Sequence, residues 1–248
     1  MKKILLIAAM FAAMTTANAE NRLSISTWNS NKLEKFDRQQ KDISMFRYVF
    51  TGWNTMCVPF DMTEEQINET FGNDCKVEAL VGAEGNDQNV TVYFNDVKSK
   101  GIEANKPYLI YYTGESKNVR IMLNNVEIKA EGAKAVCFTT ASGTTVSMSG
   151  TMDRIDGLTR YGIPAKDNGT VNFVPVSSEH NGIYPTRCSL SVMGGNNAKV
   201  NVMHGEPTSI KDLQGKVQKN GVVYNLKGQK VNANAKGIVI SDGKKHIN

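Results

Sequence analysis

The sequence predicts a mainly β protein with an antiparallel, sandwich- or jelly-roll-like body and one short helix. Short runs with alternating or continuous apolar residues recur along the chain, and clusters of Gly, Asn and Asp separate them. Many short strands at this spacing are typical of sandwiches and barrels. Only one segment, at about 63–71, carries both the start and the stop signals of a helix. A second group of short strands near the C-terminus predicts a small, separate three-stranded β unit.

The first nineteen residues have the features of a secretory signal peptide. Lys2 and Lys3 precede an apolar run, and the segment closes with the small-residue pattern Ala-Asn-Ala at 17–19. The apolar run is shorter than the roughly 20 residues that span a bilayer, so we expect no integral membrane span. We expect cleavage between Ala19 and Glu20, and hence an exported protein that is secreted, periplasmic or held at the cell surface.

The remaining chain divides by composition into a body at 20–205, a polar linker at 206–220 and a tail at 221–248. The formal net charge of +5 falls to +3 without the two leader lysines. From residue 206 onward there are eight lysines against three acids, which leaves the body at −2. A nucleic-acid-binding protein concentrates basic residues on its folded body, so we expect no nucleic-acid partner.

Strand candidates occupy most of the body. Residues 89–94 place Val90, Val92 and Phe94 on one side of a strand, whereas 106–112 is almost continuously apolar. The other candidates are 45–50, 118–123, 144–149, 170–176, 187–192 and 198–203.

The helix at about 63–71 lies in the acidic stretch that follows Trp53. Thr63 with Gln66 three residues later forms a capping-box pattern, and Gly72 is a typical stop signal. The two glutamates between them suit the first turn of a helix, so we interpret them as helix-start residues rather than a catalytic pair. We expect Trp53 and Phe71 to be core residues.

The cysteines admit two interpretations. An even number in an exported protein permits two disulfides in three alternative pairings, but a body of this length can build a core without them. We therefore favour buried, free thiols. The spacing lacks the paired cysteines of a zinc site. The four residues are Cys57, Cys75, Cys137 and Cys188.

Evidence for catalysis or for a cofactor is weak. The chain has three histidines, and His180 lies in a polar turn where a solvated side chain is the ordinary outcome. Asp153 and Asp156 are three residues apart, but spacing alone does not place two carboxylates in a cleft. The stretch at 84–89 offers oxygen ligands for calcium, but an Asn/Asp turn is the commoner explanation for such a segment. We expect no enzyme activity, no metal and no cofactor.

Three aromatic residues are the candidates for ligand binding. Trp28 lies among polar residues, Tyr93 faces away from the apolar side of its strand, and Tyr111 belongs to a strand with apolar residues on both sides. Exposed aromatic side chains stack on sugars or anchor protein partners. The alternative is that all three pack within the body, since a sandwich uses both of its sheets.

The first half of the body resembles a known module. The stretch GWNTMCVPFDMTEEQINETFG (52–72), followed by NKPYLI (105–110), resembles a β-rich module of exported and surface proteins of the Bacteroidetes. In that module W-N-T-x-C-x-P-F precedes a short helix and a strand of the G-K-P-Y-L-I type. The resemblance implies an adhesin-like or carbohydrate-associated role.

The tail resembles a type A C-terminal sorting segment of the type IX secretion system. The matching pieces are Val-Tyr-Asn-Leu at 223–226, Gly-Gln-Lys-Val at 228–231, Gly-Ile at 237–238 and Lys-Lys at 244–245. Val239 departs from the pattern, because an aromatic residue is usual there, and the segment is shorter than a full sorting domain. The resemblance implies that the tail directs the location of the protein.

These observations favour an exported, non-catalytic binding module with a glycan or a surface or host protein as its ligand. A secreted hydrolase of polysaccharide or peptide, with an unlocated carboxylate pair, is one alternative. A structural subunit of a surface assembly is another. The identity of the ligand and the oligomeric state stay open at this stage.

The leader yields the first testable prediction. N-terminal sequencing of the exported protein should begin at Glu20, because signal peptidase cleaves after the small-residue pattern. A start upstream of Ala17, or retention of the apolar run, contradicts the assignment.

Overall fold

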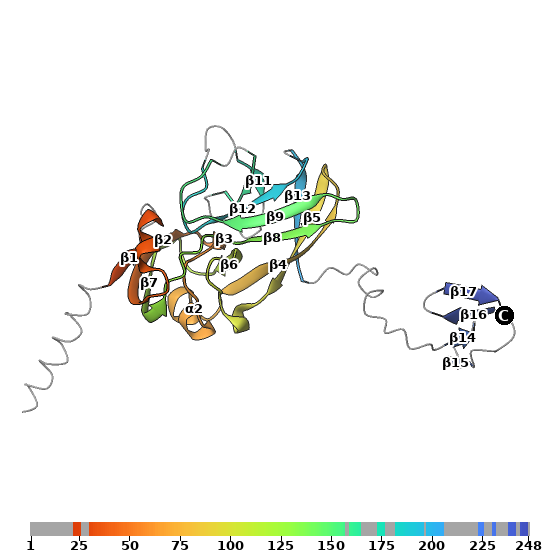
Figure 1. Cartoon of the computed structure of the whole chain (residues 1–248), viewed down its shortest axis with the longest axis horizontal. Helices are drawn as coiled ribbons and strands as arrows, with labels where there is room; N and C mark the ends of the chain where they lie inside the picture. Colours follow the sequence, from red (N-terminus) through yellow and green to blue (C-terminus); the bar gives the residue numbers. More distant parts are fainter. Residues whose placement is uncertain are drawn as a thin grey trace, which may run out of the picture. The chain divides into compact units, whose positions relative to one another are not determined.

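The computed structural model is mainly β, as predicted (Figure 1). The chain divides into two compact units, Met1–Glu206 and Pro207–Asn248. No helix in the described part of the chain is long and apolar enough to cross a membrane. The structure describes residues 22–25, 30–156, 159–164, 173–176, 182–195 and 197–205, together with the backbone of 223–225, 230–231, 238–241 and 244–247.

A five-stranded sheet lies at the centre of the first unit. Its strand order is β13-β5-β4-β6-β3. All its pairs are antiparallel except β13 with β5, which is parallel, so the sheet is mixed where antiparallel pairing was expected. The strands are β3 (Gly52–Met56), β4 (Lys76–Gly85), β5 (Asn89–Asp96), β6 (Tyr108–Tyr112) and β13 (Lys199–His204).

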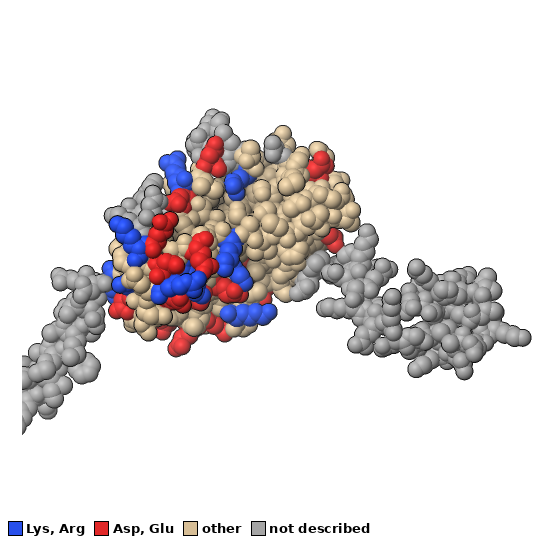
Figure 2. All heavy atoms as spheres, in the orientation of Figure 1, with Lys and Arg blue, Asp and Glu red and all other residues tan. Residues whose placement is uncertain are grey.

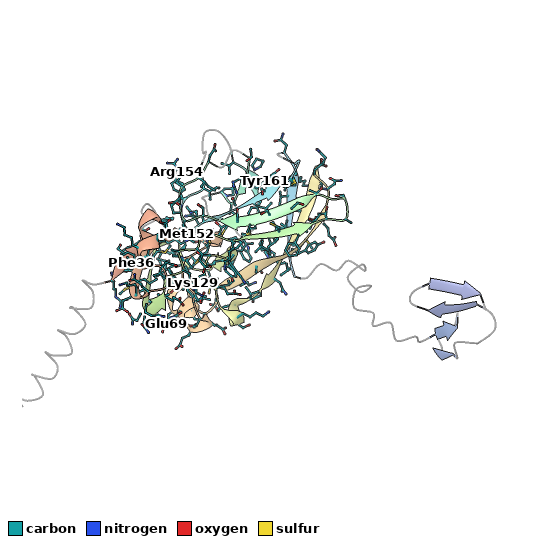
Figure 3. All side chains as sticks on the ribbon, viewed as in Figure 1. Phe36, Glu69, Lys129, Met152, Arg154 and Tyr161 are labelled. Atoms are coloured by element: carbon teal, nitrogen blue, oxygen red, sulfur yellow. The ribbon has the colours of Figure 1, made fainter. Side chains whose placement is uncertain are left out.

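A second five-stranded sheet covers one face of the central sheet, which gives the predicted sandwich-like arrangement. The two sheets share a core in which Phe94 and Leu109 of the central sheet join Met148 and Tyr161 of the second. Tyr161, labelled in Figure 3, donates a hydrogen bond from its hydroxyl to Gly195 O (2.5 Å). The order is β11-β10-β12-β9-β8, with β8 (Ala135–Thr139), β9 (Thr145–Gly150), β10 (Tyr161–Gly162), β11 (Val174–Pro175) and β12 (Cys188–Val192).

A three-stranded sheet and the helix cover the other face of the central sheet. Met45 and Ile121 of the small sheet pack in one cluster with Ile67 of the helix and Ile110 of the central sheet. The small sheet has the order β1-β2-β7, with β1 parallel to β2. The elements are β1 (Leu23–Ile25), β2 (Gln40–Val49), β7 (Lys117–Glu127), α2 (Glu64–Phe71) and the short 3-10 helices η1 (Ser30–Phe36) and η2 (Lys98–Lys100).

Burial on both faces explains the almost continuous apolar sequence of β6. Leu109 belongs to the core shared with the second sheet, and Ile110 belongs to the core shared with the small sheet. Strand β3 behaves in the same way, with Trp53 on one side and Met56 on the other. Strands covered on both faces lose the polar alternation of half-exposed strands. The prediction that Trp53 is a core residue is confirmed, since it is 6% exposed.

The capping prediction for the helix is confirmed. Gln66 N donates to Thr63 Oγ1 (3.3 Å), and Thr63 N donates to Gln66 Oε1 (2.9 Å), which is the reciprocal capping box. Gly72 ends the helix with φ of 93°, in the region that favours glycine. Ile67 and Phe71 are buried, so the helix attaches to the body by one apolar face.

The turn between β4 and β5 uses the Asn-rich segment that was also a candidate for calcium. Asn86 Oδ1 accepts hydrogen bonds from the backbone N–H groups of Gln88 and Asn89 (3.0 Å each), as in an Asx turn. Gly85 has φ of 103°, and a Cβ there would lie 2.2 Å from Asn89 O. The formation of this turn therefore explains why Asn and Gly occur in the segment.

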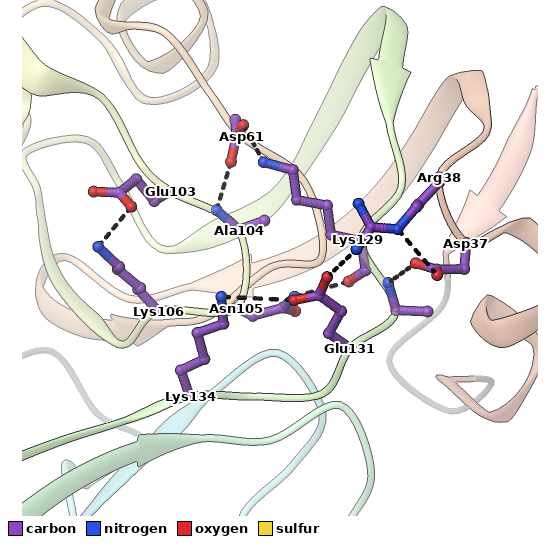
Figure 4. Close-up of polar contacts among 11 residues, drawn as sticks. Asp37, Arg38, Asp61, Glu103, Ala104, Asn105, Lys106, Lys129, Glu131 and Lys134 are labelled. Carbon is purple, nitrogen blue, oxygen red and sulfur yellow. Dashed lines mark hydrogen bonds and ion pairs between the residues drawn. The ribbon is translucent and has the colours of Figure 1, made fainter.

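Ion pairs fasten the connection from β7 to β8 across the surface (Figure 4). Lys129 Nζ lies 2.6 Å from Asp61 Oδ2, and Lys129 N donates to Pro59 O (2.8 Å). Arg38 pairs with Glu131 (2.5 Å). Exposed pairs of this kind contribute little individually, so the backbone bonds define the path. Figure 2 shows acidic and basic side chains interspersed over β2, β7 and α2, whereas the part over β8 and β9 is mostly uncharged on that face.

The cysteines are free thiols, and three of the four are buried. The expectation that all are buried is wrong for Cys137, which lies on the exposed side of β8. This strand is at the edge of its sheet, where alternate residues face outward. Burial raises the pKa of the Cys57 thiol, and it raises that of Cys188 to about 12, so neither is an activated nucleophile.

The second unit contains an antiparallel sheet of four short strands rather than the predicted three. The segment expected to form the first strand provides two, β14 and β15, which pair with each other. The order is β15-β14-β16-β17, with β14 (Val223–Asn225), β15 (Lys230–Val231), β16 (Ile238–Ser241) and β17 (Lys244–Ile247).

The capping box predicts the effect of a single substitution. Thr63→Ala removes the side-chain acceptor for Gln66 N, and loss of such a cap costs about 0.5–2 kcal/mol. The free energy of unfolding from denaturant melts should fall by that amount. Thr113→Ala, at an exposed threonine after β6, is the matched control and should leave the midpoint nearly unchanged. Equal midpoints for the two variants would count against the helix start.

Candidate functional site: an arginine pocket

A pocket of about 390 Å³ lies where β1 ends beside β2. The last residue of β1, Ile25, pairs with Met45, so residues 46–48 of β2 follow the final partner of β1. The opposite wall is the turn before β12. The lining residues are Ser24, Ile25, Phe46, Arg47, Tyr48, Asn118, Tyr184, Pro185, Thr186 and Arg187.

Arg47 forms the inner wall of the pocket and is 2% exposed. Strand alternation directs Met45, Arg47 and Val49 inward, and Phe46 and Tyr48 outward. The guanidinium of Arg47 donates to the carbonyl oxygen of Thr186, to Thr186 Oγ1 (3.0 Å) and to the carbonyl oxygen of Thr55. A buried cation is thus held by neutral acceptors.

The acceptors of Arg47 belong to two other parts of the fold. Thr55 lies on β3 of the central sheet, and its Oγ1 accepts from Cys188 N of β12 (3.0 Å). Thr186 has φ of 63°, and its carbonyl oxygen also accepts from Cys57 N (3.0 Å). Arg47 therefore connects the small sheet, the central sheet and the turn that leads into the second sheet.

Arg187 adds a second positive charge to the pocket. It is half-buried, and its Nη2 donates to the backbone oxygen of Tyr48 (3.2 Å). A guanidinium has five N–H donors, and this bond uses one of them. The Arg187 side chain therefore retains donors for a ligand.

No carboxylate lines this pocket within the described part of the chain. Burial, followed by the charge of Arg187, lowers the pKa of Arg47 to about 9. Burial is also the cause that lowers the pKa of Arg187. Arginine side chains stay protonated in proteins, so both carry their charges at neutral pH. An acid partner would have raised these pKa values, so the two cations occupy the site without compensation from a described carboxylate.

Three exposed aromatic side chains surround the opening. Phe46 is 54% exposed, Tyr48 is 42% exposed and Tyr184 is 41% exposed. Arg120 lies 5.1 Å from the ring centroid of Phe46. Arg154, labelled in Figure 3, lies 5.3 Å from that of Tyr184. The site combines guanidinium donors with partly exposed aromatic side chains.

The predicted ligand-binding residues do not form this site. Trp28 lies outside the described residues. Tyr93 on β5 is half-buried, and its hydroxyl donates to Glu84 Oε2 (3.0 Å). Tyr111 on β6 packs against Trp53 with ring centroids 5.1 Å apart. Neither tyrosine lines the pocket, and β4 separates their strands.

The other candidate residues are also apart from the pocket. Asp153 and Asp156 are exposed, and neither lines it. His180, like the cleavage site at Ala19 and Glu20, lies outside the described residues. Among the residues that the structure describes, no group of three or more His, Cys, Asp and Glu side chains is placed to hold a metal ion.

Sequence reasoning missed the pocket because its residues come from distant segments. The run MFRYVF was predicted to be a strand, but its three aromatic residues share one side of the alternation, with Arg47 on the other. That pattern favours an aromatic core face and a solvent-facing arginine, the reverse of what the structure has. Charged residues are rarely buried, so Arg47 reads as a solvent-facing position. The one usable signal was an arginine between two aromatic residues in a strand.

Arg47 should be a stabilising residue. Arg47→Met leaves buried acceptors at Thr186 and Thr55 without their donor, which costs about 1–3 kcal/mol. The free energy of unfolding should fall by this amount in denaturant melts. Arg120→Met, at an exposed arginine of the neighbouring strand, is the matched control and should have little effect. An Arg47→Met protein as stable as the parent would show that these bonds do not hold the sheets together.

Comparisons with known proteins add no relative. No protein-family model, curated protein or solved structure matches this chain.

Proposed function

We propose that this chain is an exported, non-catalytic binding module, secreted or held at the cell surface, that takes a glycan or a protein as its ligand. The observation that carries the proposal is the pocket at the end of β1. It presents Arg187 as a half-buried donor and Phe46, Tyr48 and Tyr184 as exposed aromatic faces. Convergent polar groups within an aromatic-lined hollow are typical of ligand sites.

The chemistry of the pocket supports binding over hydrolysis. A retaining glycosidase places two carboxyl groups about 5 Å apart around the scissile bond, and the described residues that line this pocket include no carboxylate. The nearest thiols also argue against covalent catalysis. Cys57 and Cys188 are buried with raised pKa values, whereas a nucleophilic cysteine needs a stabilised thiolate.

The position of the pocket supports a stable, preformed site. Two of its aromatic residues, Phe46 and Tyr48, lie on the ten-residue strand β2, where that strand pairs with β7. Its arginines are fixed by backbone acceptors. A site that is ordered before the ligand arrives avoids the entropic cost of ordering side chains during binding.

A glycan array probed with the mature chain tests this function. We expect retention of a restricted set of glycans, without release of new reducing ends from the bound sugars during prolonged incubation. Release of reducing ends would favour the hydrolase alternative. Absence of retention, together with concentration-dependent self-association in analytical ultracentrifugation, would favour the structural subunit.

A further inference from the structure

The pocket holds two like charges in a setting that favours an anion. Arg47 is almost fully buried, and burial followed by the charge of Arg187 lowers its pKa. Arg187 is half-buried, and burial lowers its pKa as well. Buried charges are ordinarily paired. The lining residues that the structure describes supply no negative charge. A bound anion would offset both the desolvation of the guanidinium groups and their mutual repulsion.

The two arginines differ in what they offer to a ligand. Arg47 has three intramolecular acceptors and almost no exposed surface, so it acts mainly through its positive field. Among the described residues, Arg187 has one hydrogen-bond acceptor, and its side chain is partly exposed. A planar guanidinium pairs with carboxylate and similar oxyanions through parallel N–H donors. Arg187 is therefore the group placed to contact an oxyanion directly.

The remaining lining groups indicate what carries the anion. Phe46, Tyr48 and Tyr184 present exposed aromatic faces around the opening. Ser24 and Asn118 are exposed polar residues on the same lining. Aromatic faces suit the apolar faces of sugar rings, and hydroxyl and amide groups suit ring hydroxyls. The pocket volume is at the lower end of the range for small-molecule sites.

We propose that this pocket binds an acidic saccharide, with its ring-borne carboxylate or sulfate held by Arg187 in the positive field of Arg47. The sugar ring lies against the aromatic side chains at the opening. This inference rests on the proposed binding function and specifies its ligand class.

The test uses the mature chain and a panel of saccharides on an array, followed by calorimetric titration. The carboxylate probes are trigalacturonate and sialyllactose, and the sulfate probe is a sulfated galactose disaccharide. Methyl-esterified trigalacturonate is the uncharged control for trigalacturonate. We expect the parent protein to retain at least one acidic probe and to bind the ester more weakly. Higher salt should weaken the acidic interaction, because ions screen partly exposed charges.

Two charge-matched variants identify the residue responsible. Arg187→Met should weaken binding of the acidic probe by about tenfold or more, the effect of losing a charge-assisted hydrogen bond. Arg160→Met removes the same charge from a half-buried arginine that does not line the pocket, and should leave the affinity unchanged. Circular dichroism melts of both variants establish that they are folded. Arg187→Lys should recover only part of the affinity, since lysine keeps the positive charge but lacks the planar pair of N–H donors.

The outcomes separate this inference from the proposed function. Retention of neutral glycans or of a protein ligand, unaffected by Arg187→Met, would overturn the acidic-saccharide inference and leave the binding module intact. Equal loss of affinity in the Arg187 and Arg160 variants would also overturn it, because only net charge would then matter. An Arg187-dependent preference for a tripeptide with a free carboxylate over every saccharide would reject the sugar. Binding to no saccharide and not to the tripeptide would overturn the acidic-saccharide inference, and concentration-dependent self-association in addition would overturn the binding module.

Discussion

The fold depends on a buried cation, Arg47, that has no acid beside it among the described residues. Arg47 projects from β2 towards the interior and donates to backbone oxygens of Thr55 and Thr186. These acceptors lie on the central sheet and on the turn that enters β12. A buried charge is costly unless strong acceptors surround it, so the surrounding backbone must hold its carbonyl groups in place. Thr186 does so at φ of 63°, a conformation that a β-branched residue rarely adopts.

The central sheet can supply this framework because both of its faces are covered. Met56 and Val77 pack towards the small sheet and the helix, while Leu80 and Leu109 pack towards the second sheet. One layer is therefore common to two apolar cores. A shift in the register of β3 would exchange the residues of these cores and would also move the Thr55 acceptor away from Arg47. The register of β3 is therefore constrained both by the packing of its apolar side chains and by the hydrogen bond from Arg47 to Thr55.

Local patterns in the sequence predicted the local structure well. The capping box at Thr63, the turn at Asn86 and the apolar run of β6 each follow from neighbours in the chain. The pairing of β13 with β5 did not, because strand partners more than a hundred residues apart leave no local trace. The candidate site was missed for the same reason, since Arg47 and Thr186 are 139 residues apart. A buried arginine also contradicts the general rule that charged residues face water.

The parallel pairing of β13 has a consequence for the order of folding. Lys199 to His204 align with Asn89 to Phe94, so the central sheet gains its outer strand only from the last part of the body. A chain made from its N-terminus cannot complete this sheet until nearly the whole body has been synthesised. Closing so long a loop is slow compared with forming a local hairpin such as β4–β5. Until that segment arrives, the outer edge of β5 lacks its partner strand, while β3, β6, β4 and β5 can already pair with one another.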